Sequence, residues 1–168
     1  MRRTFAVINQ MVADGAIENY ALADAIGAMF YVEPFSTKDI DVFVLTPGQE
    51  ILTEIPGLDY LKTHGYTEGR NEGVVIEDWP VQFMPVSNPL EHEAYLNAQD
   101  KELDGVPVRV VLPEHLVAIM LRVGRLKDLA RAEMFFSQQA VDLIALKDVV
   151  ERHSLSERFD EFRKRMEE

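Results

Sequence analysis

The chain has 168 residues, of which 47% are hydrophobic and 27% charged, and this composition predicts one globular domain with its own hydrophobic core. Its formal net charge of −12 argues against general, high-affinity binding of DNA, because contacts with a phosphate backbone depend on basic side chains. Without cysteine, a signal-peptide pattern or an apolar run near the ~18 residues of a membrane span, the sequence predicts a cytoplasmic protein with no disulfide, thiolate metal site or membrane contact.

Helix and strand signals alternate at the start of the chain. Residues 4–15 carry apolar side chains at helical spacing and end in a glycine, which predicts a helix. Residues 18–24 predict a short buried strand, and residues 25–33 predict a helix that ends before Pro34. The apolar run that closes residues 35–45 predicts a second buried strand.

The middle of the chain mixes hairpins with helices. Residues 46–65 predict a loop and a helix, which Pro56-Gly57 interrupts. Residues 73–86 predict a hairpin that turns near Asp78-Trp79, with Val81 and Phe83 on one face and Gln82 and Met84 on the other. Residues 88–99 predict a helix, and 101–112 predict a hairpin around Asp104-Gly105.

The signal becomes helical at Pro113, a residue that suits the first turn of a helix. Stretches of helical spacing continue to the end of the chain over 113–121, 126–139, 140–153 and 155–168. The whole sequence therefore predicts an α+β fold in a single domain, 1–168. A small mixed β-sheet with flanking helices is expected over about 1–112, and a helical C-terminal part over about 113–168.

Two carboxylates stand at the entrance of the second predicted strand. The alternation of a strand puts Asp39 and Asp41 on one face, ~6.5–7 Å apart at Cα, and the isoleucine between them on the other. Carboxylates this close raise each other's pKa unless a cation lies between them. Such a pair suits Mg²⁺, which takes one or two protein carboxylates and completes its shell with water and phosphate oxygens. Exposed surface charges are the alternative interpretation of the same two residues.

The segment from Tyr20 to Val44, "YALADAIGAMFYVEPFSTKDIDVFV", resembles the nucleotidyltransferase superfamily, which has the DNA polymerase β-like fold. It looks most like the small prokaryotic members related to AbiEii abortive-infection and toxin–antitoxin proteins. That family has a strand, a Gly-Gly or Gly-Ser turn, a helix, and a strand with Thr-x-Asp-x-Asp, which residues 37–41 match in full. The resemblance spans roughly residues 20–155 and implies that Asp39 and Asp41 hold Mg²⁺ and carry catalysis.

Basic residues gather in "LRVGRLKDLARA", residues 121–132. A solvated helix face is one interpretation of such a run, and a local anion site is the other. The resemblance assigns nucleotide or phosphate contacts to five residues: Thr37, Lys38, Arg122, Lys127 and Arg131. We expect Arg122, Lys127 and Arg131 to face the same cleft as the aspartates, because a cleft lined only by carboxylates repels a nucleotide.

Two positions depart from the family pattern. Ala23-Asp24 replaces the glycine pair, and Asp24 is interpreted as an N-cap whose carboxylate competes with phosphate for the helix N–H groups. Gln82 stands where the family has a third carboxylate. The first hypothesis is therefore a Mg²⁺-dependent nucleotidyltransferase that moves a nucleoside monophosphate from a nucleoside triphosphate to a hydroxyl on a protein, RNA or small molecule. The second is a catalytically degenerate fold that binds a partner, as in a toxin–antitoxin-like pair.

Overall fold

The protein is described by a computed structural model that covers residues 1–45 and 56–167. Within these residues, seven strands form one mixed sheet in the order β3-β4-β5-β2-β1-β7-β6. The strands are β1 (Tyr20–Leu22), β2 (Ile40–Val44), β3 (Gly69–Arg70), β4 (Gly73–Ile76), β5 (Trp79–Pro85), β6 (Gln99–Leu103) and β7 (Val106–Val110). At the centre, β2 runs antiparallel to β1 and parallel to β5, so the sheet is mixed as the sequence predicts.

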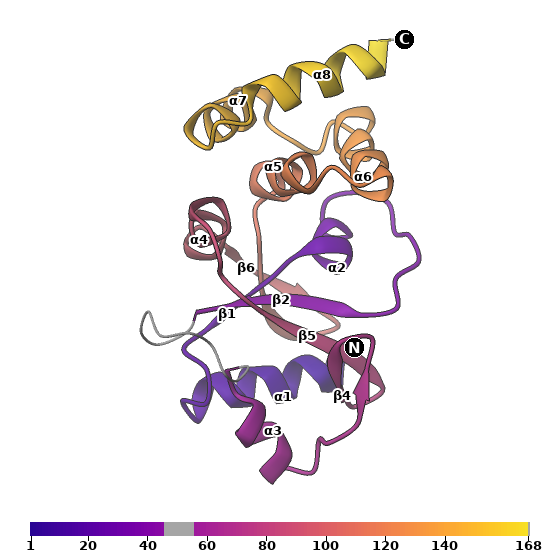
Figure 1. Cartoon of the computed structure of the whole chain (residues 1–168). Helices are drawn as coiled ribbons and strands as arrows, with labels where there is room; N and C mark the ends of the chain where they lie inside the picture. The colour runs from indigo at the N-terminus through magenta and orange to yellow at the C-terminus, as the bar shows by residue number, and fades with distance from the viewer. Residues whose placement is uncertain (46–55, 168) are drawn as a thin grey trace.

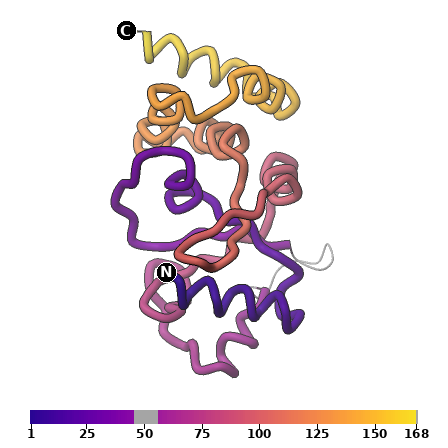
Figure 2. Tube along the Cα trace, turned by 180° about the vertical axis from the view of Figure 1, so that it is seen from behind, coloured from indigo at the N-terminus to yellow at the C-terminus, as the bar shows by residue number. Residues whose placement is uncertain are grey.

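Helices cover both faces of the sheet (Figure 1). They are α1 (Arg2–Ala13), α2 (Asp24–Ala28), α3 (Leu58–Thr63), α4 (Pro89–Leu96), α5 (Pro113–Val123), α6 (Leu126–Ser137), α7 (Leu143–Arg152) and α8 (Ser156–Glu167). Helices α1 and α3 lie on one face, and α2, α4 and α5 lie on the other, with α6 to α8 stacked beyond α5. Figure 2 shows the same layers from behind, with the C-terminus at one end of the molecule and the N-terminus beside the sheet. The predicted α+β class and the helical C-terminal part are confirmed.

The side chains of β2 divide between two hydrophobic cores. Ile40, Val42 and Val44 are fully buried in the core that contains α1 and α3. Phe43 points the opposite way, into the core that contains α5 to α8. Since burial of one such side chain stabilises a protein by ~1.5–3 kcal/mol, the register of β2 is firmly set, and the alternate positions Asp39 and Asp41 must face the α5 side.

Glu93 of α4 joins the sheet-containing part to the C-terminal helices. Its Oε1 accepts hydrogen bonds from Nε2 of His115 at 3.1 Å and from Arg152 at 2.5 Å. Its Oε2 accepts one from Nε2 of His153 at 2.6 Å. The Arg152 guanidinium, helped by the two histidine hydrogen bonds, lowers the pKa of Glu93 to about 2. This carboxylate therefore holds α4 against α5 and the end of α7.

Several element boundaries differ from the prediction. Helix α2 ends at Ala28, earlier than expected, and the predicted loop and helix over 46–65 can be compared only from residue 56 onward, where α3 lies. The β4–β5 turn consists of Glu77 (φ 52) and Asp78 (φ 86), one residue earlier than predicted. Two left-handed residues suit a two-residue hairpin turn, so Trp79 belongs to β5. None of the helices in the described ranges is long and apolar enough to span a membrane.

Candidate functional site

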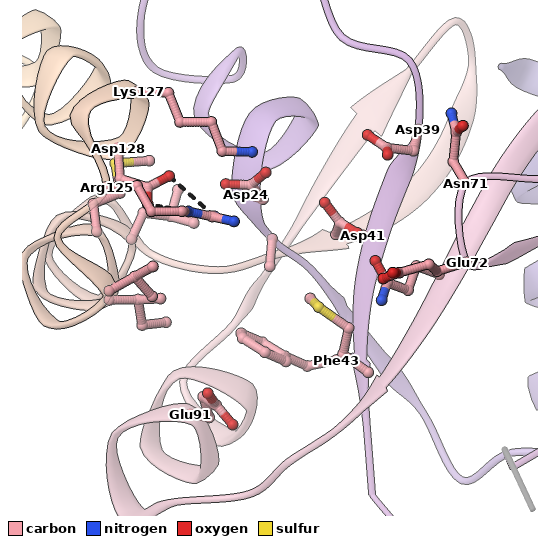
Figure 3. Close-up of a pocket in the computed structure, with 17 residues that line it drawn as sticks. Asp24, Asp39, Asp41, Phe43, Asn71, Glu72, Glu91, Arg125, Lys127 and Asp128 are labelled. Atoms are coloured by element: carbon pink, nitrogen blue, oxygen red, sulfur yellow. Dashed lines mark hydrogen bonds and ion pairs between the residues drawn. The ribbon is translucent and has the colours of Figure 1, made fainter.

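A cavity of about 550 Å³ opens on the sheet face that carries Asp41. Strands β2 and β5 form its floor, α5 and the start of α6 form one wall, and the β3–β4 turn lies on the opposite side (Figure 3). Both aspartates of the Thr-x-Asp-x-Asp motif line this space, which has the size of a small-ligand site. The motif and the cavity therefore coincide.

The two aspartates differ in how they are held. Asp41 lies in a central strand and is only 9% exposed, whereas Asp39 precedes that strand and is half-buried. The Thr37 hydroxyl lies 3.3 Å from Oδ1 of Asp39 and 3.2 Å from its backbone oxygen. Thr37 does not line the cavity, so its structural role is to orient Asp39.

Burial raises the pKa of Asp41 to about 7. The nearby carboxylates of Asp24 and Asp39 add to this effect, and only the Lys127 ammonium acts in the opposite direction. The hydrogen-bond partner of the Asp41 carboxyl, among the described residues, is another carboxyl, that of Asp24, and this contact also raises the pKa of Asp41. A buried carboxylate without a compensating partner is costly, so the site is suited to a cation that arrives from solution.

The wall of the cavity formed by α5 is apolar. Helical spacing brings four of its side chains to the same side: Leu116, Ile119, Met120 and Val123. Phe43 and Met84 extend this surface from the sheet. The cavity therefore has an apolar wall beside its acidic floor, an arrangement that accommodates a ligand with both planar and charged parts.

The start of α6 supplies basic side chains to the cavity. Lys127 lines it as predicted and points from α6 toward Asp24 (Figure 3). Arg125 also lines it, but its guanidinium donates hydrogen bonds of 2.7 and 3.2 Å to Asp128, which is 1% exposed. Because Arg125 is committed to that buried carboxylate, Lys127 is the cavity cation, among the described lining residues, that has no ion-pair partner.

Arg131 does not line the cavity, contrary to expectation. Its guanidinium forms an ion pair of 2.8 Å with Asp24 and lies 5.0 Å from the centre of the Phe35 ring. Asp24 is therefore not the N-cap that the sequence indicated: Ala23 occupies the cap position, and no side chain caps the helix. The backbone of Asp24 has φ 41, a left-handed conformation that glycine adopts more readily. Asp24 thus has a backbone conformation that suits the glycine of the family pattern, although it is not glycine.

Two other predicted basic residues also lie outside the cavity. Arg122 lines a separate hollow of about 410 Å³ together with Arg152 and His153. The reason is that α5 turns its apolar stripe to the cavity, which directs Arg122 elsewhere. Lys38 is exposed and does not line the cavity either. The expectation of one cleft shared by three basic residues is thus met by Lys127 alone.

Gln82 pairs directly with Asp41 across the parallel strands β5 and β2, and its side chain lines the cavity. The predicted neutral position beside the aspartates is therefore in place. Glu77 cannot substitute for it, because its carboxylate binds Arg3 at 2.6 Å and the Tyr66 hydroxyl at 2.8 Å. Two acidic lining residues were not predicted, Glu72 in the β3–β4 turn and Glu91 on α4, since neither belongs to a recognisable motif.

The residues that line the cavity provide some, but not all, of the ligands that a divalent cation needs. Asp39 and Asp41 offer carboxylate oxygens, the ligands that Mg²⁺ prefers, and the buried one lacks a compensating charge. Within the described residues, however, no group of three or more histidine, aspartate or glutamate side chains is placed to hold a metal ion. The site therefore suits Mg²⁺ only when water or the phosphates of a bound ligand complete its coordination.

No protein-family model matches the sequence, and no curated protein does so either. Solved structures that are similar to this one include the following three. An antigenic nucleotidyltransferase-like protein from Paracoccidioides brasiliensis aligns with a TM-score of 0.53 at 14% identity, over 81% of this chain and 75% of that one. ANT(2″)-Ia in complex with adenylyl-2″-tobramycin aligns with a TM-score of 0.49 at 14% identity, over 96% of both chains. The Megavirus polyadenylate synthase aligns with a TM-score of 0.47 at 16% identity, over 82% of this chain and 32% of that one.

At these identities the similarity concerns the fold. The alignment with the Paracoccidioides brasiliensis protein has a TM-score above 0.5 and covers 81% of this chain, so the two architectures can be compared. The resemblance inferred from the Thr-x-Asp-x-Asp motif and the structural similarity are independent observations that agree. The chain therefore has a nucleotidyltransferase-like α+β fold, with the motif aspartates in its main cavity.

Proposed function

We propose that the protein is a Mg²⁺-dependent nucleotidyltransferase, which moves a nucleoside monophosphate from a nucleoside triphosphate to a hydroxyl acceptor. The observation that carries this proposal is the buried carboxylate of Asp41, which faces a cavity together with Asp39 and Lys127. The nucleotidyltransferase-like fold supports it. Since nucleoside triphosphates are cytoplasmic metabolites, the proposal also places the protein in the cytoplasm.

Each residue has a distinct task in this reaction. Asp39 and Asp41 would hold Mg²⁺, which supplies positive charge to the phosphates of the bound nucleotide. Lys127 would contact the phosphates and balance the charge that develops on the leaving pyrophosphate. The acceptor oxygen forms a bond to the α-phosphorus, the bond from that phosphorus to the pyrophosphate oxygen breaks, and the hydroxyl proton passes to solvent.

A second candidate function is a partner-binding module that has lost turnover, as in the AbiEii-related toxin–antitoxin systems that the sequence resembles. Two observations favour it. The Asp24 carboxylate lies in the cavity near Asp41, where it repels phosphate, and the lining residue beside Asp41 is the neutral Gln82. This candidate predicts that nucleotides do not bind.

Nucleotide binding and pyrophosphate release together test the proposal. Each of the four nucleoside triphosphates is added with Mg²⁺. The melting temperature is measured, together with the release of pyrophosphate when water serves as the acceptor of the nucleoside monophosphate. A nucleotide at ~100 times its dissociation constant should add ~2.7 kcal/mol to the free energy of unfolding. Asp39→Asn and Asp41→Asn should abolish pyrophosphate release, whereas Asp100→Asn, on the exposed strand β6, should not change it.

Absence of both signals with all four nucleotides would refute the enzymatic proposal and leave the partner-binding candidate. Binding without pyrophosphate release in the presence of Mg²⁺ would contradict both candidates, because the enzymatic proposal requires release and the partner-binding candidate predicts that nucleotides do not bind. Release that persists in both aspartate variants would place the chemistry elsewhere, because the proposal gives these carboxylates an essential role.

A further inference from the structure

Arg131 of α6 makes contacts that suit a role in the candidate site, although it does not line the cavity. Its guanidinium donates a hydrogen bond of 2.8 Å to Oδ1 of Asp24, a residue 107 positions away in the chain. We propose that Arg131 is a positioning residue: by holding the Asp24 carboxylate, it limits the repulsion of a triphosphate and leaves Lys127 available to the phosphates. This inference rests on the proposed function and adds a residue to its site.

One face of α6 holds the segment that joins α2 to β2, residues 29–39. Figure 1 shows this segment passing α6 on its way to the strand. Three pairs make the contacts: Arg131 lies 5.0 Å from the centre of the Phe35 ring, the Phe135 ring lies 6.3 Å from that of Tyr31, and Gln138 accepts a hydrogen bond of 2.9 Å from the backbone N–H of Glu33. Positions 131, 135 and 138 are four and three residues apart, so they share one side of the helix. The guanidinium of Arg131 therefore has a defined position beside Asp24.

Asp24 lies between Arg131 and the buried aspartate of the motif. Its side chain is 25% exposed and that of Arg131 is 15% exposed, so their ion pair is largely shielded from water. The carboxyl of Asp24 also forms a hydrogen bond with that of Asp41, and it lines the cavity in which the triphosphate would bind. Without the arginine, a carboxylate beside Asp41 would present an uncompensated negative charge to the phosphates.

The same ion pair affects Lys127. Lys127 and Arg131 are four residues apart on α6, so their side chains lie on the same side of the helix. The Lys127 ammonium points toward Asp24 (Figure 3), but no carboxylate of the described residues forms an ion pair with it. A carboxylate that already binds a guanidinium attracts a second cation less strongly. Loss of the Arg131 charge would therefore allow Lys127 to pair with Asp24 and would remove it from the phosphates.

A direct contact between Arg131 and phosphate is the alternative role, and it makes a different prediction. A phosphate contact would be lost on replacement of Arg131 whichever residue stood at position 24. A positioning role matters only while Asp24 carries its charge. A double-mutant cycle on the two residues therefore separates the two roles.

Calorimetric titration with Mg²⁺ and nonhydrolysable analogues of the four nucleoside triphosphates measures this cycle. Arg131→Gln should weaken binding about tenfold, because it restores a negative charge near the phosphates. Asn tolerates the left-handed backbone of position 24, and in an Asp24→Asn background Arg131→Gln should change the affinity by less than about twofold. Arg131→Lys keeps the positive charge and should bind within about threefold of the native protein.

Two controls separate this effect from one on folding. Arg163→Gln removes an arginine of α8 that pairs with Glu167 at 3.8 Å and does not line the cavity, so this variant should bind as the native protein does. The variant with both Asp24→Asn and Arg131→Gln leaves no uncompensated charge, so it should fold even if Arg131→Gln alone does not. Unchanged affinity in Arg131→Gln would overturn the inference, and so would a loss in the double variant relative to Asp24→Asn.

A measurement without nucleotide tests the effect on Lys127 directly. Acetic anhydride acetylates exposed amines, and the rate at each lysine is measured by mass spectrometry of peptides, with Lys164 of the exposed side of α8 as the internal reference. Arg131→Gln should slow the acetylation of Lys127 about threefold or more, because an ammonium held by a carboxylate reacts more slowly. Asp24→Asn in the same chain should restore the native rate.

These outcomes separate the inference from the proposed function. Slower acetylation of Lys127 in Arg131→Gln, reversed by Asp24→Asn, would support the positioning role even if no nucleotide bound, and an unchanged rate would overturn it. Conversely, nucleotide binding and pyrophosphate release that depend on the two motif aspartates, without the predicted coupling between Arg131 and Asp24, would support the proposed function and overturn this inference.

Discussion

Replacement of Asp41 by asparagine should stabilise the protein at neutral pH, although it removes a charge from the candidate site. Burial and neighbouring carboxylates raise the pKa of Asp41 from 3.8 to about 7 in the folded protein. The folded state therefore binds a proton that the unfolded state releases, so the free energy of unfolding falls as pH rises from ~4 to ~7 and stays low above that. Asparagine has the same shape and no charge to desolvate.

The magnitude follows from the size of the pKa change. Each unit corresponds to ~1.4 kcal/mol, so the rise from 3.8 to about 7 sets an upper limit of ~4 kcal/mol. Relaxation of the side chain and entry of water into the open cavity reduce this by about half. We expect Asp41→Asn to raise the free energy of unfolding by ~2 kcal/mol at pH 8 and by only a few tenths at pH 4, where the aspartate is protonated in the folded state and still about half protonated in the unfolded state.

Urea denaturation at pH 8 and pH 4, in buffer with a chelator, measures the difference directly. Asp39→Asn is the matched control, because Asp39 is half-buried and its substitution should have a smaller effect. If Asp41→Asn is destabilising at pH 8, or if its effect is the same at both pH values, the carboxylate has an internal partner and the argument for a cation site fails.

Three further predictions concern the surroundings of the site. Asp24→Gly should strengthen Mg²⁺-triphosphate binding by tenfold or more in calorimetric titration, because it removes a carboxylate from the cavity and suits the left-handed backbone; unchanged affinity would contradict it. Glu93→Gln should lower the free energy of unfolding by ~1–2 kcal/mol at pH 7 in urea denaturation, after allowance for solvent screening. In the native protein this contribution is complete above pH ~4.5 and disappears as pH falls through about 2, since the pKa of Glu93 is lowered to that value; insensitivity to acid would argue against it. Gly73→Ala should lower the melting temperature, because its Cβ would lie 2.5 Å from a backbone oxygen of β5, whereas Gly65→Ala, in open space but also at positive φ, should cost only the backbone strain.

The sequence alone determined the features that depend on local periodicity. Alternation along one strand was enough to put Asp39 and Asp41 on the same face, because successive side chains of a strand point to opposite sides. The hairpin at Asp104-Gly105 followed from its turn residues, which adopt φ 51 and φ 78. The neutral position of Gln82 beside Asp41 could also be anticipated, since strand alternation again decides which way it faces.

Only the tertiary structure decided which charges meet. The four basic residues within 121–132 cannot be told apart by composition, but the packing of α5 and α6 brings Lys127 to the cavity, turns Arg122 away and pairs Arg131 with Asp24. Glu72 had no local signal at all, because a hairpin turn of two non-glycine residues in left-handed conformation is not apparent in the sequence. The physical reason is that periodicity follows from covalent geometry a few residues at a time, whereas a charge acquires its partner through contacts between segments far apart in the chain, such as the Arg131–Asp24 ion pair.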